Sequence, residues 1–250
     1  MIHTYSSNKM KEMVLNQIRK QGYNIVKLRN TFKEQKQLLG IENPIIFDVG
    51  AHKGETVSNY LSLFKNPSIF SFEPTPSSYK MLNNMFNGQI KPINKALGSK
   101  IGKKEFLIKN VSSCNSFFKI KDYAKKYKNA EENGKILVEV DTIDNFCNKN
   151  RIQKVDILKL DVQGYEVEVL KGATSMLTNK KIKLIYAETY FNPAYEGDCC
   201  NIYDVGSLLE SWGYSLYNIY NLFYDTETKM LRFGESLFIT KEILMKMLSG

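Results

Sequence analysis

Short apolar runs alternate along the chain with segments whose apolar residues recur at helical spacing. Five of these runs are predicted to be strands, and they cover residues 45–48, 69–73, 91–94, 156–161 and 182–188. The segments between and after them are predicted to be helices, over residues 55–64, 74–85, 166–177 and 202–212. Alternating strands and helices of this kind indicate a parallel sheet that has helices on both faces.

Two further runs, residues 214–220 and 237–240, are predicted to form a closing hairpin whose turn lies near residues 225–227. The predicted fold class is therefore α/β, with a Rossmann-like, mostly parallel sheet of seven strands. An antiparallel strand is expected near one edge of that sheet.

Two segments depart from the alternation. Residues 104–108 and 136–140 are predicted strands, and the polar, lysine-rich stretch between them predicts a lid-like insertion at about 109–135. Near the start of the chain, apolar residues at helical spacing predict an N-terminal helical extension over residues 1–40, for packing or for contacts in a homo-oligomer. The main domain is then expected to cover residues 41–250.

Composition narrows the class of protein. The 250 residues suffice for one domain with a full core, and no apolar run approaches the ~20 residues of a membrane span. The first residues lack the apolar core of a signal peptide, so we expect a cytoplasmic protein. The four cysteines have no C-x-x-C spacing, and His3 and His52 are the only histidines, so we predict no disulfide framework and no metal site.

The net charge of +9 favours an anionic partner such as a nucleotide-sugar, an acidic glycan or RNA, although a solvated lysine-rich surface explains it equally well.

The first predicted strand runs into the loop Asp48-Val49-Gly50-Ala51-His52-Lys53-Gly54. A pyrophosphate loop presents N–H groups to an anion, which Asp48 would repel, and His52 replaces the second glycine of the dinucleotide fingerprint. S-adenosyl-L-methionine fits better, because it has no phosphate and carries a sulfonium and an ammonium group. Glu73, at the end of the next strand, would accept hydrogen bonds from the ribose hydroxyls. The alternative is that both acids only cap helices.

Six motifs occur in order and in register with the predicted strands: F-D-V-G-A-H-K-G, F-E-P-T-P, I-N-K-A-L-G, V-D-T-I-D, D-I-L-K-L-D-V-Q-G-Y-E-V-E-V-L-K-G-A and I-Y-A-E-T-Y. From about residue 45 to residue 212 the sequence resembles the FkbM-type family of S-adenosylmethionine-dependent methyltransferases. The resemblance implies a seven-stranded class I fold and O-methylation of sugar hydroxyls or polyketides. Gln163 stands where the family often has Glu, so a metal site of such relatives is not carried over.

The candidate site residues follow from the strand ends and from the resemblance, which places residues 94–96 beside the adenine. Cofactor binding is predicted for Asp48, Gly50, Ala51, His52, Gly54, Glu73, Pro74, Asn94, Lys95, Ala96, Asp161 and Val162. Substrate binding is predicted for Ser113, Asn115, Gln163 and Tyr190.

Methyl transfer to a hydroxyl needs a group that takes the proton, and Glu188, Asp161 and His52 are the candidates. We favour Glu188, at the end of its predicted strand. His52 has a suitable intrinsic pKa, but it could equally only pack on the cofactor.

The leading hypothesis is an O-methyltransferase that acts on a sugar of a polysaccharide or of its nucleotide-linked precursor. The alternatives within the same chemistry are a small natural product, such as a polyketide, and RNA. Two other classes are weaker hypotheses. A nicotinamide-dependent oxidoreductase requires a phosphate-tolerant first loop, and an RNA-binding protein would have a recognised RNA-binding motif, which the sequence lacks.

Overall fold

The computed structural model describes residues 2–21, 29–197 and 201–249. The chain divides into two units, Met1–Thr31 and Phe32–Gly250, so the boundary lies ahead of residue 40. The first unit contains helix α1 (Ile2–Lys20). Residues 22–28 of the predicted N-terminal helical segment lie outside the described residues, as do Cys199 and Cys200.

The second unit is built on a seven-stranded sheet with the order β3-β2-β1-β7-β8-β10-β9. Its strands are β1 (Ile45–Val49), β2 (Ser68–Phe72), β3 (Lys91–Ile93), β7 (Val155–Leu160), β8 (Ile182–Tyr190), β9 (Tyr214–Tyr224) and β10 (Leu231–Thr240). In this sheet, β10 alone runs opposite to the other six strands, and it lies between β8 and the edge strand β9. The predicted fold class is confirmed, and the closing hairpin is longer than the pattern predicts.

Helices cover both faces of this sheet, because successive residues of the buried strands point to opposite sides. Ile46 packs in one apolar cluster and Phe47 in the other. The Ile46 side is covered by α2 (Thr31–Leu39), α3 (Glu55–Leu63), α4 (Pro76–Met85) and α10 (Lys241–Ser249), the last of which the sequence pattern does not predict. The Phe47 side is covered by α6 (Ile143–Lys149), α7 (Glu166–Lys171), α8 (Thr174–Thr178) and α9 (Ile202–Ser211).

The single helix predicted over residues 166–177 is wrong, because the structure divides it into α7 and α8 at Gly172. A Cβ atom at Gly172 would lie 2.0 Å from the carbonyl oxygen of Gly98, so the chain turns where two backbones meet. The Asp144 carboxylate then accepts hydrogen bonds from the first amides of α8, at 2.8 and 3.0 Å, and a new helix begins there.

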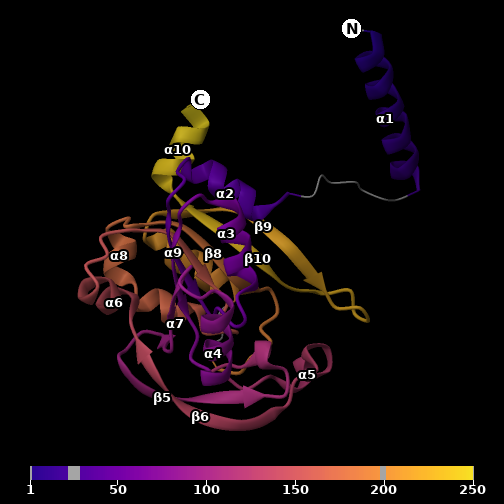
Figure 1. Ribbon diagram of the computed structural model, residues 1–250. Coiled ribbons are helices and arrows are strands. Elements are labelled where there is room, and N and C mark those ends of the chain that lie inside the picture. The colour runs from indigo at the N-terminus through magenta and orange to yellow at the C-terminus, as the bar shows by residue number, and fades with distance from the viewer. Residues whose placement is uncertain (1, 22–28, 198–200, 250) are drawn as a thin grey trace. The chain divides into compact units, whose positions relative to one another are not determined.

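A second, three-stranded sheet has the order β4-β6-β5 and is made of β4 (Ala96–Leu97), β5 (Gly102–Lys109) and β6 (Glu132–Asp141). Figure 1 shows β5 and β6 as a long hairpin at the bottom of the view. The predicted insertion lies between them and contains the 3-10 turn η1 (Ser112–Cys114) and α5 (Asp122–Lys128). Among the helices that the structure describes, none is long and apolar enough to cross a membrane.

Candidate functional site

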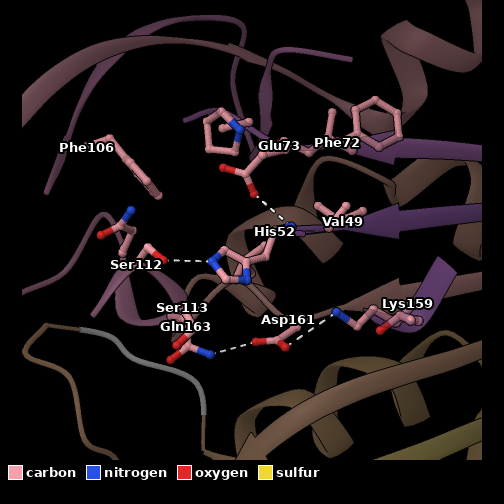
Figure 2. Close-up of a pocket in the computed structure, with 18 of the residues that line it drawn as sticks. Val49, His52, Phe72, Glu73, Phe106, Ser112, Ser113, Lys159, Asp161 and Gln163 are labelled. Atoms are coloured by element: carbon pink, nitrogen blue, oxygen red, sulfur yellow. Dashed lines mark hydrogen bonds and ion pairs between the residues drawn. The ribbon is translucent and has the colours of Figure 1, made fainter. Parts of the chain in front are cut away.

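A cavity of about 440 Å³ lies at the carboxyl ends of β1, β2 and β7, between the main sheet and the β5–β6 insertion (Figure 2). This is the position at which open α/β sheets bind ligands. Many predicted site residues line the cavity: Gly50, Ala51, His52, Glu73, Pro74, Ala96, Ser113, Asn115, Asp161, Val162 and Gln163. The cavity lining in the described chain does not include Asp48, Gly54, Asn94, Lys95, Glu188 or Tyr190.

The loop after β1 is held against the end of β7 through Gly50. This glycine has a φ of +78°, and a Cβ atom there would lie 1.9 Å from the carbonyl oxygen of Asp161. Gly54 has a φ of +88° and serves a different contact, since its Cβ would lie 2.2 Å from the ring of Phe86 behind the loop. Of the two glycines, Gly50 therefore sets the geometry of the cavity itself.

Glu73 follows the last residue of β2 and is buried with only 5% of its surface exposed. Its Oε2 accepts a hydrogen bond from the backbone N–H of His52 at 3.0 Å, and its Oε1 accepts one from Thr75 at 2.8 Å. Burial raises the pKa of Glu73, and these two hydrogen bonds oppose that effect. From outside the cavity, the Asn94 amide donates to the carbonyl oxygens of Glu73 and Pro74 at 2.9 and 3.1 Å, and so braces the loop.

His52 connects the loop after β1 to the insertion. Its Nε2 lies 2.9 Å from Oγ of Ser112 in η1, and its Nδ1 lies 3.8 Å from the Glu55 carboxylate at the start of α3. Ser112 and Glu55 also line the cavity, and Figure 2 shows the imidazole pointing across it toward Ser112. The His52 backbone has a φ of +47°, a conformation that most residues avoid and that is often associated with functional sites.

Gln163 stands between Asp161, which follows β7, and Glu188, which lies inside β8 near its end. Its amide nitrogen donates to Oδ1 of Asp161 at 2.7 Å and to Oε2 of Glu188 at 3.2 Å, and its oxygen accepts from the Tyr195 hydroxyl at 2.5 Å. The Tyr190 hydroxyl donates to Glu188 from the other side, at 2.5 Å. Glu188 and Tyr190 are thus linked to the cavity through Gln163.

Lys159 of β7 was not predicted from the sequence. It is 6% exposed, and its ammonium lies 3.4 Å from Oδ2 of Asp161 and 3.5 Å from Oδ1 of Asp48. Burial alone would lower the pKa of Lys159, but the carboxylates of Asp161, Asp48 and Glu235 outweigh it and raise the pKa, so the side chain is protonated. The sequence feature that could have indicated this residue is a lysine among the apolar residues of the strand D-I-L-K-L-D.

Asp48 itself is completely buried, and burial raises its pKa against the opposing effect of Lys159. Neither of its carboxylate oxygens has a hydrogen-bond partner in the part of the chain that the structure describes.

Further residues of the cavity come from segments that sequence reasoning did not assign to the site. Glu235 of β10 lines it and accepts hydrogen bonds from Tyr186 and Asn221. On the insertion, the rings of Phe106 and Phe117 meet edge to face at 4.9 Å and form an aromatic wall. Lys95, predicted beside the cofactor, lies near Glu139 and Asp141 of β6, at 3.4 and 3.7 Å, and outside the cavity lining.

Comparison with known proteins finds relatives that transfer methyl groups. A 2-O-methyltransferase NoeI of Sinorhizobium fredii is 26% identical over 185 residues, which cover 69% of this chain and 75% of the relative. A hexuronic acid methyltransferase AglP of Haloferax volcanii is 23% identical over 155 residues, which cover 61% of this chain and 59% of the relative.

A solved precorrin-6y C5,15-methyltransferase from Geobacter metallireducens is 11% identical, with a TM-score of 0.44 over 87% of this chain and 93% of its own. The Methyltransferase FkbM domain family matches residues 48–225, a span that contains every predicted site residue. The chain therefore belongs to the FkbM methyltransferase family and is a methyltransferase.

Proposed function

We propose that this methyltransferase uses S-adenosyl-L-methionine and methylates a sugar hydroxyl in glycan biosynthesis. The observation that carries the proposal is the buried Glu73 carboxylate. Its oxygens accept the backbone N–H groups of His52 and Thr75, and the Thr75 side chain donates a hydrogen bond to it as well. A carboxylate has about four acceptor positions, so the remaining capacity can receive further donors such as the hydroxyls of a ribose.

The charge of the cavity supports the same cofactor. The residues that line the cavity include one lysine, Lys159, and four acids, Glu55, Glu73, Asp161 and Glu235. Such a lining suits a ligand that carries a sulfonium and an ammonium group, and it disfavours a dinucleotide pyrophosphate. In this proposal Glu73 holds the ribose, and Ala96 with the Phe106–Phe117 wall flanks the adenine. Gly50 and Ala51 contact the methionine part.

S-adenosyl-L-methionine, when bound, supplies an electrophilic methyl group on its sulfonium. The chain must then align an acceptor hydroxyl, exclude water and take a proton. His52 is the first candidate for the proton, because it lines the cavity and has Glu55 near Nδ1 and a hydroxyl on Nε2. Asp161 has donors on both oxygens, which favour its ionised form, so it suits the attraction of a positive charge better than the uptake of a proton. Glu188, the base that the sequence favours, becomes the second candidate, because it contacts the cavity residue Gln163 but does not itself line the cavity.

The two relatives differ in the group that an acceptor could offer, since a hexuronic acid has a carboxylate as well as hydroxyls. The acidic lining would repel an acceptor carboxylate, and the single cavity-lining lysine in the described chain is engaged by Asp48 and Asp161. We therefore favour a neutral hydroxyl as the acceptor, and methylation of a uronic carboxylate is the second candidate.

We expect purified protein to bind S-adenosyl-L-methionine in isothermal titration calorimetry. We also expect it to methylate a member of a panel of sugars, uronic acids and nucleotide-sugars analysed by mass spectrometry. A methyl ether survives mild alkali, whereas a methyl ester is hydrolysed, so retention of the label after alkali supports the hydroxyl acceptor. Loss of the label would assign the carboxylate instead. Binding of NADH without binding of S-adenosyl-L-methionine would contradict the methyltransferase mechanism as a whole.

His52→Asn should lower turnover by about 10²- to 10⁴-fold, the usual contribution of a general base, and should leave cofactor affinity nearly unchanged. Asparagine tolerates the positive φ of this position, and the backbone N–H that Glu73 accepts is retained. Both quantities can be measured by steady-state assay and calorimetry. Glu188→Gln is the matched comparison: if it abolishes turnover while His52→Asn does not, Glu188 is the base.

A further inference from the structure

We infer that Asp48, the acid of the first motif, reaches the cofactor only through Lys159, and that Lys159 is a positioning residue for Asp161. This inference rests on the proposed function, because it concerns the site for S-adenosyl-L-methionine. The sequence pattern predicts direct cofactor binding by Asp48, and it contains no role for Lys159.

The sheet brings the three side chains together. Asp48 of β1 and Lys159 of β7 are opposite each other in the parallel register, so both point to the same face. Asp161 follows the end of β7 two residues later, on the same side, where its Oδ2 meets the ammonium at 3.4 Å (Figure 2). The ammonium lies 3.5 Å from Asp48 on its inner side, so Lys159 bridges an acid inside the sheet and an acid in the cavity.

Burial makes Asp48 and Lys159 depend on each other. Asp48 is 0% exposed and Lys159 is 6% exposed. Neither Asp48 oxygen has a hydrogen-bond partner within the described ranges, so the ammonium is the charge that compensates this carboxylate. A buried ion that loses its partner is strongly destabilising, whereas removal of both partners together is much better tolerated.

The effect on the cavity passes through Asp161, which is 39% exposed at its side chain. Lys159 holds one of its oxygens and Gln163 the other, at 2.7 Å, so the carboxylate is fixed in one orientation toward the cavity. Asp48 does not line the cavity, and its charge sets how much of the lysine's positive charge remains uncompensated next to Asp161.

A double-mutant cycle tests this arrangement. The dissociation constants of S-adenosyl-L-methionine and S-adenosylhomocysteine are measured by calorimetry for wild type, Asp48→Asn, Lys159→Met and the double variant. Asp48→Asn should weaken the sulfonium-bearing cofactor about tenfold, and the neutral thioether less, because the lysine charge is then less compensated. In the Lys159→Met background the same change should have no effect. An equal loss in both backgrounds would overturn the inference, since Asp48 would then act on the cofactor directly.

Urea unfolding of the same four proteins gives a readout that does not need a cofactor. The double variant should be more stable than Lys159→Met alone, and additive effects on stability would overturn the predicted ion pair. If Lys159→Met does not fold, Lys159→Gln takes its place in the cycle, and Asp48→Asn should again lose affinity only in the background that retains the lysine. An equal loss in both would again overturn the inference.

Lys154→Met is the matched control. This lysine precedes β7, is 53% exposed at its side chain and pairs with Asp156 at 2.9 Å, away from the cavity lining. It should leave both dissociation constants unchanged, and a change as large as that of Lys159→Met would overturn the positioning role. Wild-type protein that binds neither cofactor would contradict the proposed function, while the unfolding cycle would still decide the ion pair.

Discussion

Gly50→Ala is expected to abolish cofactor binding and to lower the free energy of unfolding by about 4 kcal/mol or more, the range of severe single substitutions. The φ of +78° alone costs an L-residue roughly 1–2 kcal/mol. The larger part comes from the Cβ atom, which would lie 1.9 Å from the carbonyl oxygen of Asp161. That oxygen belongs to the backbone, so it cannot rotate away as a side chain would. The loop after β1 must move off β7, and the cavity between them opens.

Gly88→Ala is the control for this prediction, because Gly88 has a similar φ of +74° and no atom within 4 Å of its Cβ position. It should cost only the roughly 1–2 kcal/mol of the left-handed backbone and leave cofactor binding intact. Urea unfolding and calorimetry on the two variants separate the strain of the backbone from the close approach of the two strands. Equal losses of stability and of cofactor affinity in the two variants would show that the contact of Gly50 with β7 is unimportant.

The fold class and the crevice could be predicted because the central strands are buried on both faces and read as short apolar runs between helical segments. Runs of this kind locate a strand to within a residue or two, which is enough for the fold. Details of the closing hairpin could not be predicted in the same way. Strand β9 is an edge strand with one exposed face, and its pairing with β10 contains three register shifts.

The same one- or two-residue uncertainty decides which acids enter the cavity. Glu73 and Asp161 each follow the last residue of a strand, and both line the cavity. Asp48 is still inside β1, which extends to Val49, and Glu188 is inside β8, which extends to Tyr190. A side chain within a strand is fixed to one face of the sheet and lines the cavity only where that face borders it, as Lys159 and Glu235 do. A side chain that follows the strand is free to turn into the crevice. Composition alone does not distinguish these two situations.

The wall opposite the strand ends depends on tertiary packing. Phe106 and Phe117 come from the insertion and Glu235 from β10, and they meet only because two segments far apart in sequence fold over the same strand ends. No local pattern marks them as site residues. His52 and Ser112 form the contact that joins the two parts, over 60 residues of sequence.

Glu73→Ala is expected to weaken binding of S-adenosyl-L-methionine by about 10²- to 10⁴-fold, as two hydrogen bonds to a charged acceptor are lost. The carboxylate is held in advance by the N–H groups of His52 and Thr75, so little ordering is needed when a ribose binds. Calorimetry measures the loss, and Glu42→Gln, at an exposed acid outside the cavity lining that pairs with Lys36, should have no effect.

A weaker affinity alone would not separate a lost ribose contact from a disordered loop, because Glu73 also holds the backbone of the first loop through His52. The separation comes from S-adenosylhomocysteine analogues that lack the 2′- or 3′-hydroxyl. If Glu73 accepts hydrogen bonds from these hydroxyls, their removal weakens binding to wild type by about tenfold or more and has almost no effect on Glu73→Ala, since the partner is already missing. If each deoxy analogue loses the same affinity for both proteins, Glu73 only shapes the loop, and the ribose must be held by another group.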